Sequence, residues 1–223
     1  MNIKILRQRG PGGKPYWQEF YYEKNEDQSV AGMLDELNYE DDLKDIYGNA
    51  APRIQWECSC LQGMCGACAM VINGVPALAC ATFLRDTKGD KLTVEPLRKF
   101  PTVTDLVVDR GIIQDNLRDV NAYIGEYKEA DPDEYDHMYS AAKCLKCGLC
   151  LEVCPNYSDG RTFFGALFAN DSYLIAKRSK ISDQSIKKEY NKHFAKGCSK
   201  SLSCVDVCPA KIPTLASIGK MNK

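Results

Sequence analysis

The sequence predicts an α+β protein with two domains, a strand-rich domain over residues 1–100 and an all-α domain over residues 101–223. In the first part, apolar residues alternate with polar ones over short segments, as they do along half-buried strands. In the second part, apolar residues recur every three or four positions, as they do along one face of a helix. The 12 cysteines form three groups, one in the first domain and two in the second.

The strand-rich domain is predicted to contain a single helix. Alternation predicts strands over residues 2–7, 16–22, 69–72 and 91–95, with turns at 10–13 and 73–74. Ser29 is placed to cap the helix, whose one face carries Val30, Met33, Leu34 and Leu37. A linker is predicted between Pro96 and Pro101.

Three helices are predicted in the second domain from their caps and apolar faces. Thr104 is placed to cap a helix over residues 105–109. Thr162 is placed to cap a longer helix that carries Phe163, Phe164, Leu167 and Phe168. The buried face of another helix is marked by Ile186, Tyr190 and Phe194. The acidic run 126–136 is predicted to be a solvated connector.

The composition is that of an ordinary soluble protein, with 223 residues, 44% of them hydrophobic and 26% charged. A formal charge of -1 argues against nucleic-acid binding, which needs a basic surface. The first ten residues show no apolar signal core and no twin arginines, which predicts a cytosolic protein. Disulfides are rare there, so clustered cysteines are predicted to bind metal. The apolar window Met64–Leu84 is broken by Asn73, Gly74 and Pro76, which argues against a membrane span.

The first cysteine group has the spacing of a plant-type [2Fe–2S] site. Its four members are Cys60, Cys65, Cys68 and Cys80, spaced C-x4-C-x2-C with the fourth further along. Gly63 and Gly66 let the loop wrap closely and aim its amides at the sulfurs. Zinc also takes four cysteines, but usually as two close pairs with a spacer.

The second and third groups are copies of one bacterial ferredoxin run. Cys144, Cys147, Cys150 and Cys154-Pro155 have the spacing C-x2-C-x2-C-x3-C-P. In two-cluster ferredoxins the fourth cysteine of a run ligates the other cluster, so a second run is expected. That run holds Cys198, Ser201, Cys204 and Cys208-Pro209 at the same offsets. Cross-ligation assigns Cys144, Cys147, Cys150 and Cys208 to a [4Fe–4S] cluster, leaving Cys154, Cys198 and Cys204.

Ser201 stands where the second run would have its second cysteine. Three thiolates suit a [3Fe–4S] cluster, which is the prediction here. The alternative is a fourth iron held by the Ser201 alkoxide, a harder ligand that suits iron–sulfur chemistry less well. Cys58 is left over and is predicted to be a buried or half-buried structural cysteine. A shifted register, with Cys58 in place of Cys60, would break the plant-type spacing.

Motifs for other chemistry are absent from the sequence. It contains no dinucleotide fingerprint, no phosphate loop and no recognisable acid–base pair, so no catalytic residue is predicted. His137 and His193 belong to no ligand pattern and are predicted to be helix-surface residues. A chain with three clusters and no substrate site is predicted to conduct electrons between partners on other chains.

With the clusters in this order, the chain resembles the iron–sulfur subunit of the succinate dehydrogenase/fumarate reductase family. The likeness extends to CGACAMVINGVPALAC at 65–80, VEPLRKFPTVTDLVVD at 94–109, and Phe164-Gly165 before an apolar helix. The resemblance implies a β-grasp ferredoxin domain followed by an α-helical ferredoxin domain. It also implies a flavoprotein partner with FAD, and a membrane-anchor partner with quinone, with or without haem b. The chain would then lie on the cytoplasmic face of the inner membrane, peripheral to it.

Two positions depart from the ubiquinone-using members of that family. Those members have a tryptophan five residues after the cysteine matching Cys154, and a histidine directly after the one matching Cys198. Here Asp159 and Ser199 stand there, which favours menaquinone or a related low-potential carrier. The quinone-side residues that the resemblance leaves are Pro155, Ser201 and Lys220, each of which also has a purely structural interpretation.

Two other functions keep the clusters and change the partners. One is a relative that takes electrons from thiols or another donor. Such relatives often contain an adjacent Cys-Cys pair, which this sequence lacks. The other is a free ferredoxin-like carrier, which a near-neutral chain of two domains fits poorly.

Overall fold

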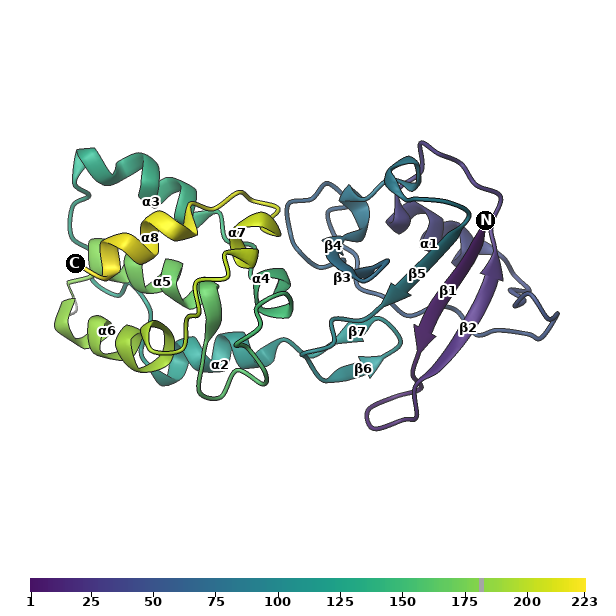
Figure 1. The fold of residues 1–223 in the computed structure, drawn as a ribbon, viewed down its shortest axis with the longest axis horizontal. Helices are drawn as coiled ribbons and strands as arrows, with labels where there is room; N and C mark the ends of the chain where they lie inside the picture. The colour runs from purple at the N-terminus through teal and green to yellow at the C-terminus, as the bar shows by residue number, and fades with distance from the viewer. Residues whose placement is uncertain (181–182) are drawn as a thin grey trace. The chain divides into compact units, whose positions relative to one another are not determined.

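The computed structural model describes residues 1–180 and 183–223, apart from the side chains of residues 183 and 184. The chain divides into two compact units, Met1–Asp109 and Arg110–Lys223. Figure 1 shows strands and helix α1 in the first unit and helices in the second. The domain boundary predicted after residue 100 lies inside the first unit.

The first unit is built on a five-stranded mixed sheet in the order β2-β1-β5-β3-β4. The strands are β1 (Asn2–Arg7), β2 (Tyr16–Tyr21), β3 (Ala69–Ile72), β4 (Val75–Leu78) and β5 (Lys91–Glu95). β1 runs antiparallel to β2 and parallel to β5, and its alternate residues Ile3 and Ile5 are fully buried. The predicted turn between β3 and β4 is formed by Asn73 and Gly74, both with positive φ, as a tight hairpin requires.

Helix α1 (Val30–Tyr39) lies against this sheet (Figure 1). Its start is confirmed, because Ser29 Oγ accepts a hydrogen bond from the amide of Gly32 at 3.1 Å. Its predicted face is also confirmed, since Val30, Met33, Leu34 and Leu37 are all buried. Two short 3-10 turns follow β4, η1 (Ala79–Ala81) and η2 (Leu84–Asp86).

The segment after β5 differs from the prediction in two ways. Leu97 and Phe100 are buried, so residues 96–101 pack into the unit instead of forming a free linker. No helix covers residues 105–109; β6 (Thr102–Thr104) and β7 (Val107–Val108) form a hairpin there. The cause is Asp105, which turns the chain with φ 43° and pairs with buried Arg7 at 2.9 Å. A helix starting at Thr104 would lose this buried pair, which is costly to break.

The second unit consists of short helices around one long one. Their bounds are α2 (Gly111–Asp119), η3 (Pro132–Glu134), α3 (Tyr135–Ala142), α4 (Leu149–Glu152), α5 (Gly165–Arg178), α6 (Asp183–Tyr190), the π-helical segment η4 (Asn191–Ala195), α7 (Ser203–Asp206) and α8 (Thr214–Met221). α5 packs against α3, α6 and α8. Ile186, Tyr190 and Phe194 are buried in this core, as predicted.

Helix α5 begins later than predicted and without a side-chain cap. It starts at Gly165, whose φ is 75°. A Cβ at this position would lie 2.1 Å from a methyl of Leu151, so both the backbone angle and the packing demand glycine. Thr162 instead presents its carbonyl to His193 Nδ1 at 3.0 Å.

The acidic run is only partly the solvated connector that was predicted. Glu126 is exposed and pairs with Lys180 at 3.2 Å. Glu134 is mostly buried and binds Lys220 at 2.6 Å, Lys177 at 3.1 Å and the Tyr173 hydroxyl at 2.8 Å. These contacts connect η3 with α5 and α8. Within the residues that the structure describes, no helix has the length and apolar character needed to cross a bilayer.

Candidate iron–sulfur centres

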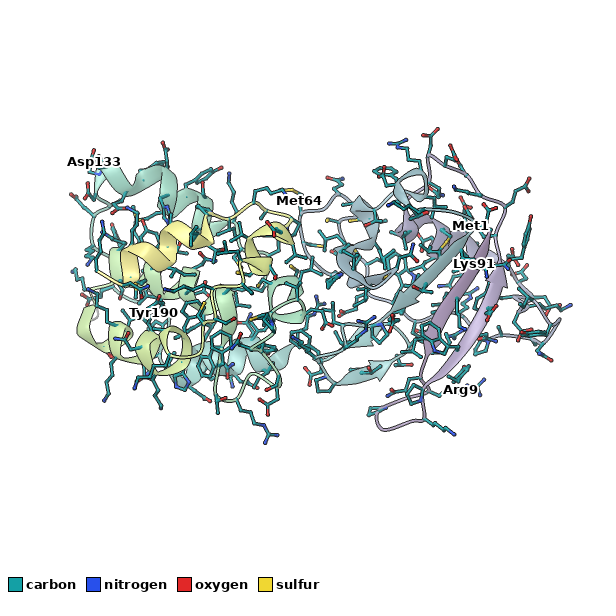
Figure 2. The ribbon with its side chains drawn as sticks, in the orientation of Figure 1. Met1, Arg9, Met64, Lys91, Asp133 and Tyr190 are labelled. Atoms are coloured by element: carbon teal, nitrogen blue, oxygen red, sulfur yellow. The ribbon has the colours of Figure 1, made fainter. Side chains whose placement is uncertain are left out.

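The first centre is a loop between α1 and β3 whose amides point at cysteine sulfurs. Gln62 and Met64 each donate their N–H to Cys60 Sγ at 3.3 Å, and Gly63 donates to Cys80 Sγ at 3.2 Å. Left-handed turns at Leu61, Gly63 and Gly66 produce this orientation. Met64 stands at the exposed tip of the loop (Figure 2).

The four cysteines of this loop and the following turn lie together. Cys68 Sγ and Cys80 Sγ are 3.3 Å apart. Cys60 and Cys65 also share a hydrogen bond, and the Ala67 amide donates to Cys65 Sγ at 3.5 Å. Cys68, at one end of the C-x4-C-x2-C motif, thus contacts Cys80, and Cys60, at the other end, contacts Cys65. The charge of Cys65 acts on Cys68 as well. The loop therefore brings together all four cysteines that the spacing predicts.

The thiols of this loop differ in acidity. Backbone amide hydrogen bonds, the one from Gln62 foremost, lower the pKa of Cys60 to about 7. Burial raises the pKa of Cys68 to about 11, and a bound cation such as iron would favour its thiolate form. Both the amide donors and the thiol set fit a [2Fe–2S] cluster, whose sulfurs accept such hydrogen bonds.

The cysteines of this loop are spread along it and are not gathered around one point. Among the described residues, no three Cys, His, Asp or Glu side chains converge closely enough to hold one ion. A tetrahedral zinc site needs four sulfurs around one centre, whereas a cluster spreads its cysteines over several irons.

In the helical unit, a small cavity is lined by five cysteines from both runs. Cys144, Cys147 and Cys150 come from the first run, and Cys204 and Cys208 from the second. Burial is the main cause that raises the pKa of Cys150, and the charges of four further cysteines raise it further: Cys147, Cys144, Cys204 and Cys208. Cys208 thus lies with the three thiols of the other run, as cross-ligation requires.

A second cavity, of about 430 Å³, holds the other set. Cys154, Cys198, Ser201 and Cys204 line it together with the aromatic rings of Phe163, Tyr190 and Phe194. Burial raises the pKa of Cys204, and the charges of Cys154 and Cys198 add to this effect. Three thiols and one hydroxyl face this cavity, a donor set that fits a three-iron cluster. Cys204 lines both cavities.

The three quinone-side residues lie in different places. Ser201 is exposed and lines the second cavity. Pro155 is exposed and is not among the lining residues. Lys220 is bound to Glu134, although its neighbours Ile218 and Gly219 line the cavity. Asp159 sits in a surface turn, where its Oδ1 accepts the Arg161 amide at 3.0 Å.

Three predictions about single residues are wrong. Cys58 is exposed rather than buried, on the chain leading into the first cysteine loop. His137 is half-buried, with Nε2 3.0 Å from Ser217 Oγ and its ring against Tyr173. His193 is also half-buried and stacks on Phe164 at 4.0 Å between ring centroids. Both histidines serve packing in this helical core because their rings contact aromatic neighbours.

Two features near the first helical cavity were not predicted. Asn170 lines it and donates to Thr214 Oγ1 at 3.0 Å, while its Oδ1 has no hydrogen-bond partner among the described residues. Lys146, between two cysteines of the first run, forms an ion pair with Asp171. Lys146 could have been noticed in the sequence, but Asn170 could not, because only the packing of α5 brings it there.

Comparison with known families divides the chain in the same order. Residues 2–115 match the model of a 2Fe-2S iron-sulfur cluster binding domain. Residues 140–212 match the model of a 4Fe-4S dicluster domain. This order, together with the mixed sheet and the helical unit, confirms the fold class predicted from the sequence.

The chain is also similar to curated proteins over most of its length. The succinate dehydrogenase iron-sulfur subunit of Bacillus subtilis is 31% identical, over 98% of this chain and 90% of that protein. The fumarate reductase iron-sulfur subunit of Escherichia coli O6:H1 is 32% identical, over 89% and 82%. A chain of the solved Mycobacterium smegmatis Sdh1 complex in the apo form shares the fold, with a TM-score of 0.79, 24% identity and coverage of 99% and 93%.

Proposed function

The chain belongs to the family of succinate dehydrogenase/fumarate reductase iron–sulfur subunits, and from this premise we propose that it carries electrons between a flavoprotein subunit with FAD and quinone in a membrane subunit. Membership makes it an oxidoreductase subunit with an electron-transfer role. The finer proposal is the route, through [2Fe–2S], then [4Fe–4S], then [3Fe–4S]. The two proposed ferredoxin domains, 1–100 and 101–223 from the sequence, correspond to the compact units Met1–Asp109 and Arg110–Lys223.

The proposal assigns every cysteine except Cys58 to a cluster. The [2Fe–2S] ligands are Cys60, Cys65, Cys68 and Cys80; the [4Fe–4S] ligands are Cys144, Cys147, Cys150 and Cys208; the [3Fe–4S] ligands are Cys154, Cys198 and Cys204. An iron–sulfur cluster, when bound, takes up and gives back single electrons at a potential that its surroundings set.

The observation that carries the proposal is the exchange of the fourth cysteine between the two runs. Cys208 lines the cavity of Cys144, Cys147 and Cys150, while Cys154 lines the cavity of Cys198 and Cys204. This supports two adjacent centres, because Cys204 lines both cavities. Adjacent centres suit a chain whose task is to pass electrons onward.

The chain's own residues supply the electrostatics of each centre. The amides of Gln62, Gly63 and Met64 donate to cysteine sulfurs, so they favour added negative charge in the first loop. At the first helical cavity, burial is the main cause that raises the pKa of Cys144, the charge of Lys146 lowers it, and the charge of Asp171 raises it. Different surroundings let one chain hold centres of different potential.

The quinone side is proposed at the second helical cavity. Its rim carries Ser201, and the positions of the aromatic and imidazole contacts of ubiquinone-using relatives are filled by Asp159 and Ser199. This favours menaquinone as the carrier and a membrane-anchor partner over this rim, with or without haem b. The proposed location is the cytoplasmic face of the inner membrane, with the chain peripheral to the bilayer.

The test is gentle detergent purification of the native complex through a tag on this chain. Fumarate reduction and succinate oxidation are measured on the purified complex, with a dye and with quinone as electron partners. We expect a flavoprotein to co-purify and both dicarboxylate activities to be present. Cys204→Ala should abolish quinone-linked activity while part of the dye-linked activity through the flavin survives.

Two outcomes would count against the proposal. If the clusters are present but neither dicarboxylate reacts, the partners are of another kind, such as a thiol-linked donor. If dye-linked and quinone-linked rates fall together in Cys204→Ala, the linear order of the centres is wrong. Cys58→Ala serves as the control and should leave all three clusters in place.

A further inference from the structure

The charge of this chain is unevenly distributed. Residues 177–223 carry 11 lysines and arginines against 3 acidic residues, a formal charge of +8. The preceding residues carry 18 basic and 27 acidic side chains, a formal charge of -9. The net charge of the chain is close to zero although residues 177–223 are strongly basic. Such an uneven distribution indicates a surface that binds an anionic partner.

Three of these lysines form a row on one helical surface. Lys188, Lys192 and Lys196 follow each other at four-residue spacing along α6 and η4, and all three are exposed. The opposite row contains Tyr190 (Figure 2) and is buried in the helical core. Because η4 is π-helical, with more than four residues per turn, residues four apart stay in line along this surface. We call Lys188, Lys192, Lys196 and the following Lys200 the lysine ridge.

The lysine ridge has no anionic partner among the residues that the structure describes. None of its four ammonium groups forms an ion pair there, whereas Lys177, Lys180 and Lys220 are each bound to a glutamate. Successive ridge lysines on the helix start about 6 Å apart along its axis. Like charges at that spacing repel each other. Lys192 shares a surface hollow with Asp119 and Glu189 but forms an ion pair with neither, so the row itself is a net cost to the folded chain.

The lysine ridge ends at the rim of the second helical cavity. Lys200 lines that cavity together with Leu202 and Leu215. These leucines are 44% and 56% exposed, an unusual position for large apolar side chains. Cations beside protruding leucines are the combination that a membrane surface binds, with charges at the headgroups and apolar groups below them.

We propose that the lysine ridge binds the anionic headgroups of a phospholipid bilayer. That the lysine ridge faces the bilayer rests on the proposed function, in which the adjacent second cavity faces a membrane that contains quinone. Lysine is the suitable cation, because its mobile point charge matches a diffuse headgroup layer. Protein interfaces, by contrast, are depleted in lysine and enriched in arginine.

The test uses the full-length, cluster-containing chain and sucrose-loaded vesicles. Binding is measured by co-sedimentation with phosphatidylcholine alone and with phosphatidylcholine that contains phosphatidylglycerol. We expect binding only to the anionic vesicles. Binding should weaken strongly between about 0.1 M and about 1 M salt, where the Debye length falls from about 10 Å to about 3 Å.

The decisive variant is Lys188→Gln/Lys192→Gln/Lys196→Gln. Each lysine removed should lower the partition coefficient about fivefold, which corresponds to ~1 kcal/mol per lysine near an anionic surface. The matched control is Lys14→Gln/Lys88→Gln/Lys91→Gln, which removes the same charge from exposed positions of the first unit. The control should bind like the unmodified chain.

Three results would overturn this proposal. They are equal binding to neutral and anionic vesicles, equal loss in both triple variants, and absence of binding to anionic vesicles. If vesicles are not bound but the ridge variant loses its membrane subunit, the ridge recognises an acidic protein surface instead. Vesicle binding needs no dicarboxylate activity, so a failure of the proposed function would be seen separately in the purified complex.

Discussion

The two cysteine runs of the helical unit follow the same backbone path with different side chains. We call residues 144–157 the first run and residues 198–211 the second run. Lys146 and Lys200 occupy equivalent positions with φ of 53° and 59°, and Gly148 and Leu202 follow with φ of 86° and 64°. One short helix starts after each, α4 in the first run and α7 in the second.

The side chains give the two runs opposite surroundings. In the first run, Cys147 is 8% exposed, and Leu149 and Leu151 are buried as α4 packs on α5. In the second run the equivalents Ser201, Ser203 and Val205 are exposed or half-buried, beside the larger cavity. The spacing of the cysteines therefore determines the backbone conformation of a run. Burial of the other side chains determines whether the centre beside the run is exposed to solvent.

The strongest test of this difference is to remove the side chain at the equivalent position in each run. Cys147→Ala should abolish the [4Fe–4S] signal, because the fourth iron of that cluster loses its thiolate and the three thiolates that remain match the three-iron set. Ser201→Ala should keep both clusters, because three thiolates already complete the other set. Iron and acid-labile sulfide analysis of the purified complex, with electron paramagnetic resonance, measures both outcomes. Loss of a cluster in Ser201→Ala would mean that the serine alkoxide is a ligand.

A gain of one ligand sharpens the same comparison. Ser201→Cys should make the second run equivalent to the first and convert the three-iron centre into a four-iron one. Iron content should then rise by about one per chain, and the three-iron resonance should disappear. Ser203→Cys is the matched control, since residue 203 does not line the cavity. An unchanged three-iron signal in Ser201→Cys would contradict the equivalence of the two runs.

The equivalent left-handed positions should respond to substitution in opposite directions. Gly148→Ala should lower the free energy of unfolding by about 1–2 kcal/mol, because a Cβ is unfavourable at φ 86°. Leu202→Gly should raise it by up to about 1 kcal/mol, because the leucine is strained there and loses little buried area. Urea unfolding followed by circular dichroism measures both values. If both variants changed the free energy of unfolding in the same direction, the Leu202 side chain would contribute packing that outweighs its backbone strain.

The smallest effect is expected at the salt bridges that hold α8 beside the second run. Binding to Lys220, followed by the Tyr173 and Lys177 contacts, lowers the pKa of Glu134 from 4.5 to about 2. A lowered folded-state pKa means that the stabilisation is complete above about pH 4.5 and is lost as the pH falls towards 2. Glu134→Gln should therefore cost ~1 kcal/mol at pH 7 and flatten the acid dependence of unfolding.

The control for this last prediction is Glu129→Gln, an exposed carboxylate of the same acidic run. It should change neither the stability at pH 7 nor its acid dependence. If both variants behave alike, the acidic run 126–136 affects stability only through its net charge. If Glu134→Gln also broadens the three-iron resonance, α8 positions the wall of the second cavity.

Most of the site could be predicted from the sequence because the cysteines of each group lie close together along the chain. A cysteine run determines its own turns and the sulfurs it can present, so the spacing alone indicated which thiols belong together. The start of α1 is equally local, since Ser29 caps a helix whose apolar face follows directly. The serine at position 201 was likewise visible as a missing fourth thiolate.

What only the tertiary structure decided depends on contacts between distant residues. The hairpin at β6 and β7 exists because Asp105 reaches Arg7 on β1. Helix α5 begins at Gly165 because the φ of 75° there is not helical, and Leu151 leaves no room for a Cβ at that position. The exposure of Cys58 and the burial of both histidines also depend on what packs beside them. Local spacing determines which groups a segment can present. Burial is set by the whole fold, because it depends on neighbours that no single segment contains.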